Sequence, residues 1–494
     1  MPQYQNTVRA LLGDDVVIPP IEPDIKLHGF TSIATGELTV SPVALEEYEL
    51  AALELARQVI SNPDRRASVV GCETPDEECV SQFFTRFGRR AWRRPLTEAE
   101  LGRIADVVAQ ASDALSGDRW RGVEFGIALI LQSPDFLYRV ELGDGTDRRR
   151  KLTGYEMASR LAFVLTETGP DDALLDAAAA GELDRVDGVR HHAIALLDQP
   201  RGRDALARFF GEYLNVERIG EVSKDSVLFP QMTDALKLGM AAEVLSLFQY
   251  IAFDADTDYR EIFTTDQTFV TKELAALYGV EPPRPDEGPI AQRTLPADSP
   301  RGGLLGAAAL LAIYADHAST SPTRRGRFVR QNLLCEDIPP PPPGVDTTFA
   351  DNTGATVRER VAMHSNNASC AGCHSLMDPI GLGFERFDAI GQARIEEAPG
   401  ILVDDRGELD GIAFTGVREL GTLLANDPRV APCFVTQFYR FSTGHLELPL
   451  ERDNLEELTQ SFAASGFRVR ELALQLVTSD AFRYVGGAIE EEMP

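Results

Sequence analysis

Residues 41–60 read SPVALEEYELAALELARQVI, and this stretch indicates the fold class of the whole chain. Ser41 followed by Pro42 marks a helix start, because proline is tolerated in the first turn, where its missing N–H is not needed. Apolar residues then recur on one face at helical spacing. They are Leu45, Tyr48, Ala52, Leu55 and Val59. The stretch therefore predicts a helix with one buried face.

Helix signals of this kind recur along the chain. Two Thr-x-x-Glu capping boxes, at 97–100 and 153–156, precede apolar-periodic segments, and in such a box hydroxyl and carboxylate satisfy free backbone N–H groups reciprocally. Strand-like alternation is short and rare. The predicted fold class is mainly α, with several packed helical modules. Further helical stripes lie near 201–214, 234–253, 301–315, 323–334, 355–364, 430–442, 453–463 and 467–478.

The length and the net charge of the chain limit the kinds of protein it can be. A chain of 494 residues is longer than one hydrophobic core requires, so two to four packed units are expected. With 77 acidic and 48 basic residues, the formal net charge of -29 repels phosphate backbones, so generic nucleic-acid binding is not expected. Apolar runs such as 306–314 and 127–131 are shorter than the roughly 20 residues that cross a bilayer. No transmembrane segment is expected.

Turn-forming and charged residues gather at 143–150 and 281–301 and mark boundaries. A run of five prolines at 339–343 marks another, and it is expected to be extended because each ring fixes φ and removes a backbone donor. The predicted modules are 1–65, 66–145 with Cys72 and Cys79, 146–285, 300–412 with Cys370 and Cys373, and 413–494.

Residues 370–374 read Cys-Ala-Gly-Cys-His, the pattern of c-type haem attachment. Two thiols three positions apart on one turn can form thioethers with both vinyl groups of one haem, while the adjacent imidazole reaches the iron. The other imidazole nitrogen can be oriented by a hydrogen-bond acceptor. We therefore expect one covalent haem c on Cys370 and Cys373, with His374 as the proximal iron ligand.

Three other interpretations of the motif stay open. A zinc site needs two further ligands at short spacing, and the other cysteine pair close in sequence is Cys72 and Cys79. A thioredoxin-like redox pair needs a βαβ context, which the proline-rich approach does not offer. The third is a coincidence of structural cysteines.

The sixth iron position decides between functions, since a second strong ligand favours electron transfer and an open position permits oxygen, peroxide or substrate binding. Met377 lies three residues after His374, so reaching the opposite face of the iron requires the chain to reverse abruptly, and it ranks below a histidine. A lone histidine near a helix end is more often structural. The candidate sixth ligands are His364, His317 and Met377, followed by Met363 and His445.

Four cysteines lie outside the motif: Cys72, Cys79, Cys335 and Cys433. In an oxidising compartment they are expected to form two disulfides, for which three connectivities are possible. The alternative is a set of buried free thiols.

Two charged segments have functional and structural interpretations. The arginines at 86, 89, 90, 93 and 94 could dock an acidic redox partner or approach haem propionates, but internal ion pairs and a solvated helix face are favoured. Residues 404–411 are loosely like a calcium loop, lack the EF-hand pattern, and are predicted to form a turn.

Several segments together resemble the planctomycete cytochrome-associated proteins of unknown function. The haem-motif domain of that family is similar at 358–364, 370–374 and 377–391, at Ser321-Pro-Thr-Arg-Arg-Gly326, and in the proline run. Its other modules are similar at 4–13, 90–95, 133–139 and 438–444. The resemblance spans nearly the whole chain. It implies a multi-helical, extracytoplasmic, c-type cytochrome-like protein, in the periplasm or at the cell surface.

The first residues, Met-Pro-Gln-Tyr-Gln-Asn, have neither a basic start nor an apolar run, so they do not form a signal peptide. Members of the resembled family usually carry an export signal and more residues before the stretch similar to 4–13. The resemblance therefore implies that the native N-terminus lies upstream.

Three function classes follow. The first is a mono-haem electron carrier that exchanges electrons with a redox partner protein. The second is a haem oxidase or peroxidase-type enzyme with an open distal site, although a single C-x-x-C-H argues against dihaem peroxidases. The third is a large helical binding or scaffold protein with a structural or sensory haem. Catalysis and oligomeric state stay open.

Overall fold

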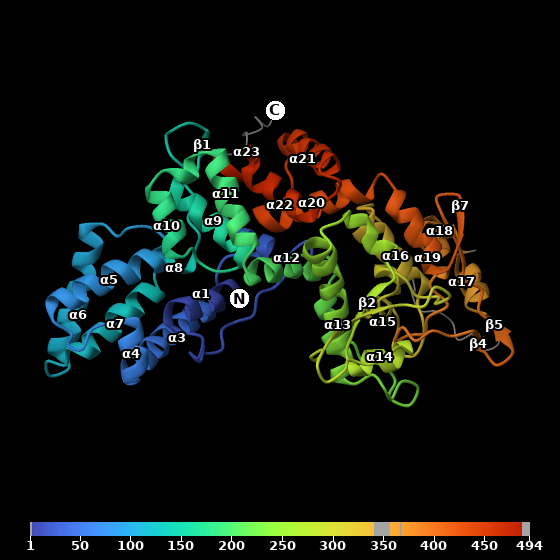
Figure 1. The fold of residues 1–494 in the computed structure, drawn as a ribbon, viewed down its shortest axis with the longest axis horizontal. Coiled ribbons are helices and arrows are strands. Elements are labelled where there is room, and N and C mark those ends of the chain that lie inside the picture. Colours follow the sequence, from blue (N-terminus) through green and yellow to red (C-terminus); the bar gives the residue numbers. More distant parts are fainter. Residues whose placement is uncertain (1, 340–355, 366–367, 487–494) are drawn as a thin grey trace. The chain divides into compact units, whose positions relative to one another are not determined.

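The computed structural model describes residues 2–339, 356–365 and 368–486, with the side chains of 364–369 outside the described set. About 60% of the chain is helical and 7% is strand, which confirms the prediction of a mainly α, multi-helical fold. The chain forms two compact units (Figure 1). Unit 1 comprises 1–205, 441–446 and 473–494, and unit 2 comprises 206–440 and 447–472.

Unit 1 is built from helices and one small antiparallel sheet, β1–β8. Its elements are α1 (Pro2–Leu12), α2 (Thr31–Glu37), α3 (Pro42–Ser61), α4 (Pro63–Val69), α5 (Glu77–Trp92), α6 (Glu98–Ala114), α7 (Arg119–Leu131), α8 (Pro134–Leu137), β1 (Arg149–Lys151), α9 (Gly154–Thr166), α10 (Asp172–Ala179), α11 (Val186–Leu197), α23 (Asp480–Arg483) and β8 (Tyr484–Gly486).

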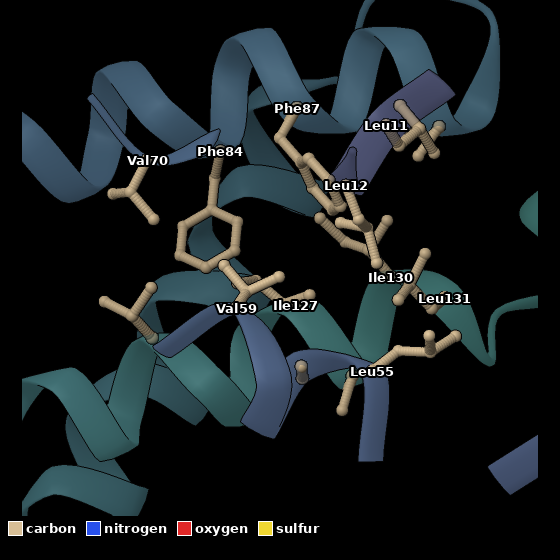
Figure 2. Packing of buried hydrophobic residues seen from close by; sticks show 14 of the residues in the cluster. Leu11, Leu12, Leu55, Val59, Val70, Phe84, Phe87, Ile127, Ile130 and Leu131 are labelled. Carbon is tan, nitrogen blue, oxygen red and sulfur yellow. The ribbon is translucent and has the colours of Figure 1, made fainter. Parts of the chain in front are cut away.

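Helix α3 begins at the predicted cap and buries one face in the core of unit 1. The Ser41 hydroxyl accepts a hydrogen bond from the Ala44 N–H and caps the helix. Leu55 and Val59 are fully buried against side chains of α1, α5 and α7 (Figure 2). Leu45, predicted on the same face, is 58% exposed, because the buried stripe passes through Ala44 instead. Both predicted capping boxes, at Thr97 and Thr153, are formed.

The arginine cluster at 86–94, in and just after α5, makes its contacts within unit 1. Arg94 pairs with Glu100 and Asp135, and Arg89 pairs with Asp176. Arg93 is buried and donates to the carbonyl oxygens at 135, 136 and 138, which are the free acceptors at the end of α8. These arginines thus form internal ion pairs, as the sequence favoured, and Arg93 also caps the end of α8.

Unit 2 contains the cysteine motif and three antiparallel two-stranded sheets, β2–β3, β4–β5 and β6–β7. Its elements are α13 (Asp234–Gln249), β2 (Gln267–Val270), α14 (Lys272–Tyr278), β3 (Ala291–Thr294), α15 (Ala308–Ile313), α16 (Pro322–Phe328), α17 (Val357–Ser365), α18 (Ala368–Leu382), β4 (Glu396–Ala398), β5 (Ile401–Leu402), β6 (Arg406–Leu409), β7 (Ile412–Thr415), α19 (Gly416–Asn426) and α21 (Arg452–Ala464). Three helices contain residues of both units: α12 (Pro200–Tyr213), α20 (Val430–Thr443) and α22 (Val469–Thr478).

Segment 404–411 ends in the turn of the β6–β7 hairpin, with Leu409 opposite Ile412. Asp410 accepts from the guanidinium groups of Arg330 and Arg429, at 2.6 and 2.7 Å. The prediction of a turn is confirmed, and these ion pairs join the hairpin to the rest of unit 2. Of the proline run, 340–343 lie outside the described residues.

Among the residues that the structure describes, one helical segment, Asp234–Asp254, is long and apolar enough by composition to cross a membrane, with a mean hydropathy of 1.3. Half of its apolar window is buried inside the structure. Within it, the Glu243 carboxylate accepts hydrogen bonds from Thr268 and Tyr278, at 2.6 and 2.5 Å. These contacts are typical of a core helix.

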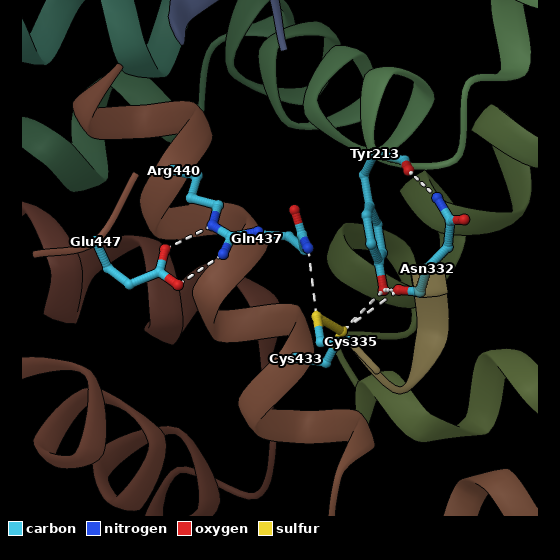
Figure 3. The surroundings of a disulfide bond; sticks show 7 residues. All are labelled: Tyr213, Asn332, Cys335, Cys433, Gln437, Arg440 and Glu447. Carbon is cyan, nitrogen blue, oxygen red and sulfur yellow. Dashed lines mark hydrogen bonds and ion pairs between the residues drawn. A yellow bond between two sulfur atoms is a disulfide. The ribbon is translucent and has the colours of Figure 1, made fainter. Parts of the chain in front are cut away.

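Both disulfides pair cysteines predicted for that role. In unit 1, Cys72 bonds to Cys79, seven residues later. In unit 2, Cys335 bonds to Cys433 of α20, 98 residues later (Figure 3). The Tyr213 hydroxyl beside this second bond donates to the carbonyl oxygen of Asn332 at 2.5 Å. The second bond closes a loop that contains α17, α18 and the C-x-x-C-H motif.

Candidate functional site

Helix α18 carries the whole cysteine motif. Residues three and four apart on a helix are neighbours, so Cys370, Cys373 and His374 share one side of a single turn. Cys370 is buried, and Cys373 is partly exposed, with its Sγ 4.0 Å from the carbonyl oxygen of Pro339. Neither belongs to a disulfide. The helix therefore presents two thiols and an imidazole together.

The imidazole of His374 is held by a carboxylate one turn further along α18. Its Nδ1 lies 2.8 Å from Oδ2 of Asp378, which is only 3% exposed. Oδ1 of the same carboxylate accepts a hydrogen bond from the Thr323 hydroxyl of α16 at 2.7 Å. Since Nδ1 is engaged, iron would be bound through the other ring nitrogen, Nε2.

A cavity of about 440 Å³ opens beside His374, within the range of small-molecule and cofactor pockets. Val361, Ala362 and Leu382 contribute apolar surface to its wall, and Arg358 and Arg406 contribute positive charge. The wall thus combines apolar surface, two guanidinium groups and the motif imidazole. This mixture suits a flat apolar cofactor with carboxylate substituents.

Both wall arginines are ordered by one carboxylate. Asp404 lies 2.8 Å from Nε of Arg358 and accepts two hydrogen bonds from Arg406, at 2.9 and 2.8 Å. The hydrogen bonds from Arg406 hold the pKa of Asp404 well below its usual range. Asp404 therefore offsets one of these two guanidinium charges, and Asp378 and Glu408 add two carboxylates to the same wall. The two guanidinium groups are the part of the wall that can pair with an anionic ligand.

Glycines set the distance between α18 and α16. A Cβ added to Gly326 of α16 would lie 1.8 Å from the carbonyl oxygen of Met377, and one added to Gly381 would lie 1.8 Å from that of Pro322. Only hydrogen fits at both positions. The two backbones therefore touch, and this approach brings Thr323 within reach of Asp378.

Gly381→Ala is expected to lower the free energy of unfolding of unit 2 by about 1–3 kcal/mol, because the new methyl group meets backbone rather than a flexible side chain. Gly372 of the same helix is the matched control, since nothing lies within 4 Å of an added Cβ there. Gly372→Ala should be neutral or stabilise by up to about 1 kcal/mol through helix propensity. Denaturant titrations by circular dichroism compare the two variants, and equal losses would contradict the glycine-contact account.

Five family models match successive parts of the chain, and each is described as a protein of unknown function. They are DUF1587 at 1–61, DUF1595 at 79–141, DUF1592 at 152–280, DUF1588 (PSCyt3) at 301–397 and DUF1585 at 410–482. The chain is an array of these five domains. Families of this set are associated with planctomycete cytochrome-like proteins. No curated protein and no solved structure matches the chain.

The PSCyt3 region contains α16, α17 and α18, and so most of the site. Two predicted sixth ligands lie away from the cavity wall. His317 is exposed, with Nδ1 3.1 Å from the carbonyl oxygen of Ser223. Met377 is buried on α18 but does not line the cavity. The side chain of His364 lies outside the described residues.

The two lower-ranked candidates for the sixth iron ligand, Met363 and His445, do not line the cavity either. Met363 is 46% exposed on α17 and does not line the cavity. His445 belongs to unit 1, where its Nδ1 lies 2.8 Å from the carbonyl oxygen of Leu446. Among the described residues, no group of three or more His, Cys, Asp or Glu side chains could hold a metal ion.

Sequence reasoning missed four residues of the site: Asp378, Thr323, Arg358 and Arg406. A local signal existed for Asp378, because it follows His374 by four residues on a helix and must share its face. Thr323 and Arg406 come from separate segments. Only the tertiary structure brings them to the motif.

Proposed function

We propose that this chain is an extracytoplasmic, mono-haem c-type cytochrome-like protein that acts in electron transfer. Haem c would be joined by thioethers to Cys370 and Cys373, with His374 as the proximal ligand. The observation that carries the proposal is the placement of both thiols and the imidazole on one turn of α18, with the imidazole on the wall of a cavity of about 440 Å³. The haem would supply a one-electron iron centre.

The chain's own residues have distinct parts in this proposal. Asp378 orients the imidazole, Val361 and Leu382 would shield an apolar ring from water, and Arg358 and Arg406 would be the basic groups available to propionates. A redox partner protein would exchange electrons at the exposed edge of the site. The two disulfides support an oxidising, extracytoplasmic compartment, where such bonds persist.

The test is a pyridine haemochrome spectrum of the full chain, exported through a c-type maturation system and then denatured. We expect a c-type band that survives denaturation and disappears in Cys370→Ala/Cys373→Ala. The matched control, Cys72→Ala/Cys79→Ala, also removes two thiols but should keep the band. Exported wild-type protein without bound haem would refute the proposal and favour a disulfide or metal role for the motif.

A second candidate function is a haem enzyme of the oxidase or peroxidase type. Its support is that, among the described residues lining the cavity, His374 is the one histidine and there is no methionine. A site without a second strong ligand accepts small molecules at the iron. Carbon monoxide binding to the reduced protein would favour this candidate, and unchanged spectra under carbon monoxide would favour the carrier.

A further inference from the structure

We propose that Asp378 is a positioning residue that fixes the proton of His374 on Nδ1 and, through its buried negative charge, lowers the reduction potential of the iron. The inference rests on the proposed function, since it concerns the same haem site.

The geometry ties this carboxylate to the imidazole. Asp378 follows His374 by one helical turn, and its Oδ2 lies 2.8 Å from Nδ1. It is 3% exposed, and its other oxygen accepts from Thr323 at 2.7 Å. The Thr323 hydroxyl comes from α16, whose distance from α18 is set by the glycine contacts. The carboxylate is thus held from two helices.

This hydrogen bond selects one tautomer of the His374 imidazole. An ionised carboxylate only accepts hydrogen bonds, so Nδ1 of His374 must carry the proton and Nε2 must present its lone pair. A carboxylate that accepts a hydrogen bond from the nitrogen that does not bind the metal also raises the basicity of an imidazole ligand. A more basic ligand donates more strongly and favours ferric over ferrous iron.

Burial decides how strong this effect is. A charge shielded from water acts through a lower effective dielectric than one at the surface. Glu408 offers the comparison, because it lines the same cavity and is exposed. We expect Asp378 to influence the iron much more than Glu408 does.

The experiment is a mediated redox titration of the haem-loaded full chain. Asp378→Asn keeps the size of the side chain and removes its charge. We expect it to shift the reduction equilibrium at least tenfold toward ferrous iron, which is about 59 mV for one electron. Glu408→Gln removes a charge at the same cavity and should shift the equilibrium by less than about threefold. A shift in Asp378→Asn below threefold, or an equal shift in Glu408→Gln, would overturn the proposal.

A second measurement separates this proposal from the presence of haem. In the haem-free full chain, labelled with ¹⁵N-histidine, the nitrogen shifts of His374 report which ring nitrogen is protonated. We expect protonated Nδ1 in the wild type and a mixture of tautomers in Asp378→Asn. If haem never attaches, the proposed function fails while this result still tests the role of Asp378. Equal tautomer mixtures in both proteins would refute that role.

Discussion

Arg325→Met is expected to lower the free energy of unfolding of unit 2 by about 3–5 kcal/mol. Arg325 is 1% exposed, and its guanidinium donates to the carbonyl oxygens of residues 311, 384, 387 and 388, at 3.1, 3.1, 3.0 and 2.7 Å. It also lies 3.8 Å from the buried Glu385. Methionine fills similar space but leaves these acceptors without that donor.

The charge of Glu385 makes this loss larger. Burial raises the pKa of the Glu385 carboxyl, and Arg325 and Arg394 oppose that rise. Burial also lowers the pKa of Arg325 to about 10, so the guanidinium stays charged at neutral pH. Removing it takes one of two positive charges from the buried Glu385, which keeps Arg394 at 2.7 Å as its partner.

Arg324→Met is the matched control for this prediction, since Arg324 is the neighbouring arginine of the same motif. It is 58% exposed and pairs with Asp316 at 3.0 Å, and an exposed pair of this kind contributes less than about 1 kcal/mol. Circular dichroism in denaturant measures both losses. Tryptophan fluorescence reports unit 1 separately, because the two tryptophans, Trp92 and Trp120, both belong to that unit. Similar losses in the two variants would disprove the role given to Arg325.

Cys335→Ala/Cys433→Ala is expected to destabilise unit 2 by about 4–5 kcal/mol. The bond joins residues 98 apart, and in the chain-entropy account a cross-link over about 100 residues restricts the unfolded chain by about 4.7 kcal/mol. The loop includes the C-x-x-C-H helix, so this helix should also unfold at a lower temperature in the variant. Denaturant titration of the oxidised proteins measures the difference in stability.

The bond between Cys72 and Cys79 provides the comparison. It closes a loop with a separation of only seven residues, for which the same relation gives about 2.5 kcal/mol. Its loss should appear in the tryptophan signal of unit 1 and leave unit 2 nearly unchanged. If both double variants lost the same stability, loop length would not be the source of the effect.

Much of the local structure was predictable. The helix starts at Ser41, Thr97 and Thr153 were predicted from their capping residues, because a cap acts on backbone groups only a few positions away. The exposure of Leu45 was not predictable in this way, because the burial of a side chain depends on which helix packs against it. In the same way, four cysteines allowed three pairings, and folding selects one of them.

The mainly α fold class and the grouping of Cys370, Cys373 and His374 on one helical turn follow from local sequence, because helical periodicity and capping are local. The burial of Arg325 beside the exposed Arg324, and the contact of Thr323 with Asp378, arise only when the chain folds. These outcomes depend on α16 and α18 meeting through Gly326 and Gly381. The reason is that burial and contact between distant segments are properties of packing, which no short stretch of sequence specifies alone.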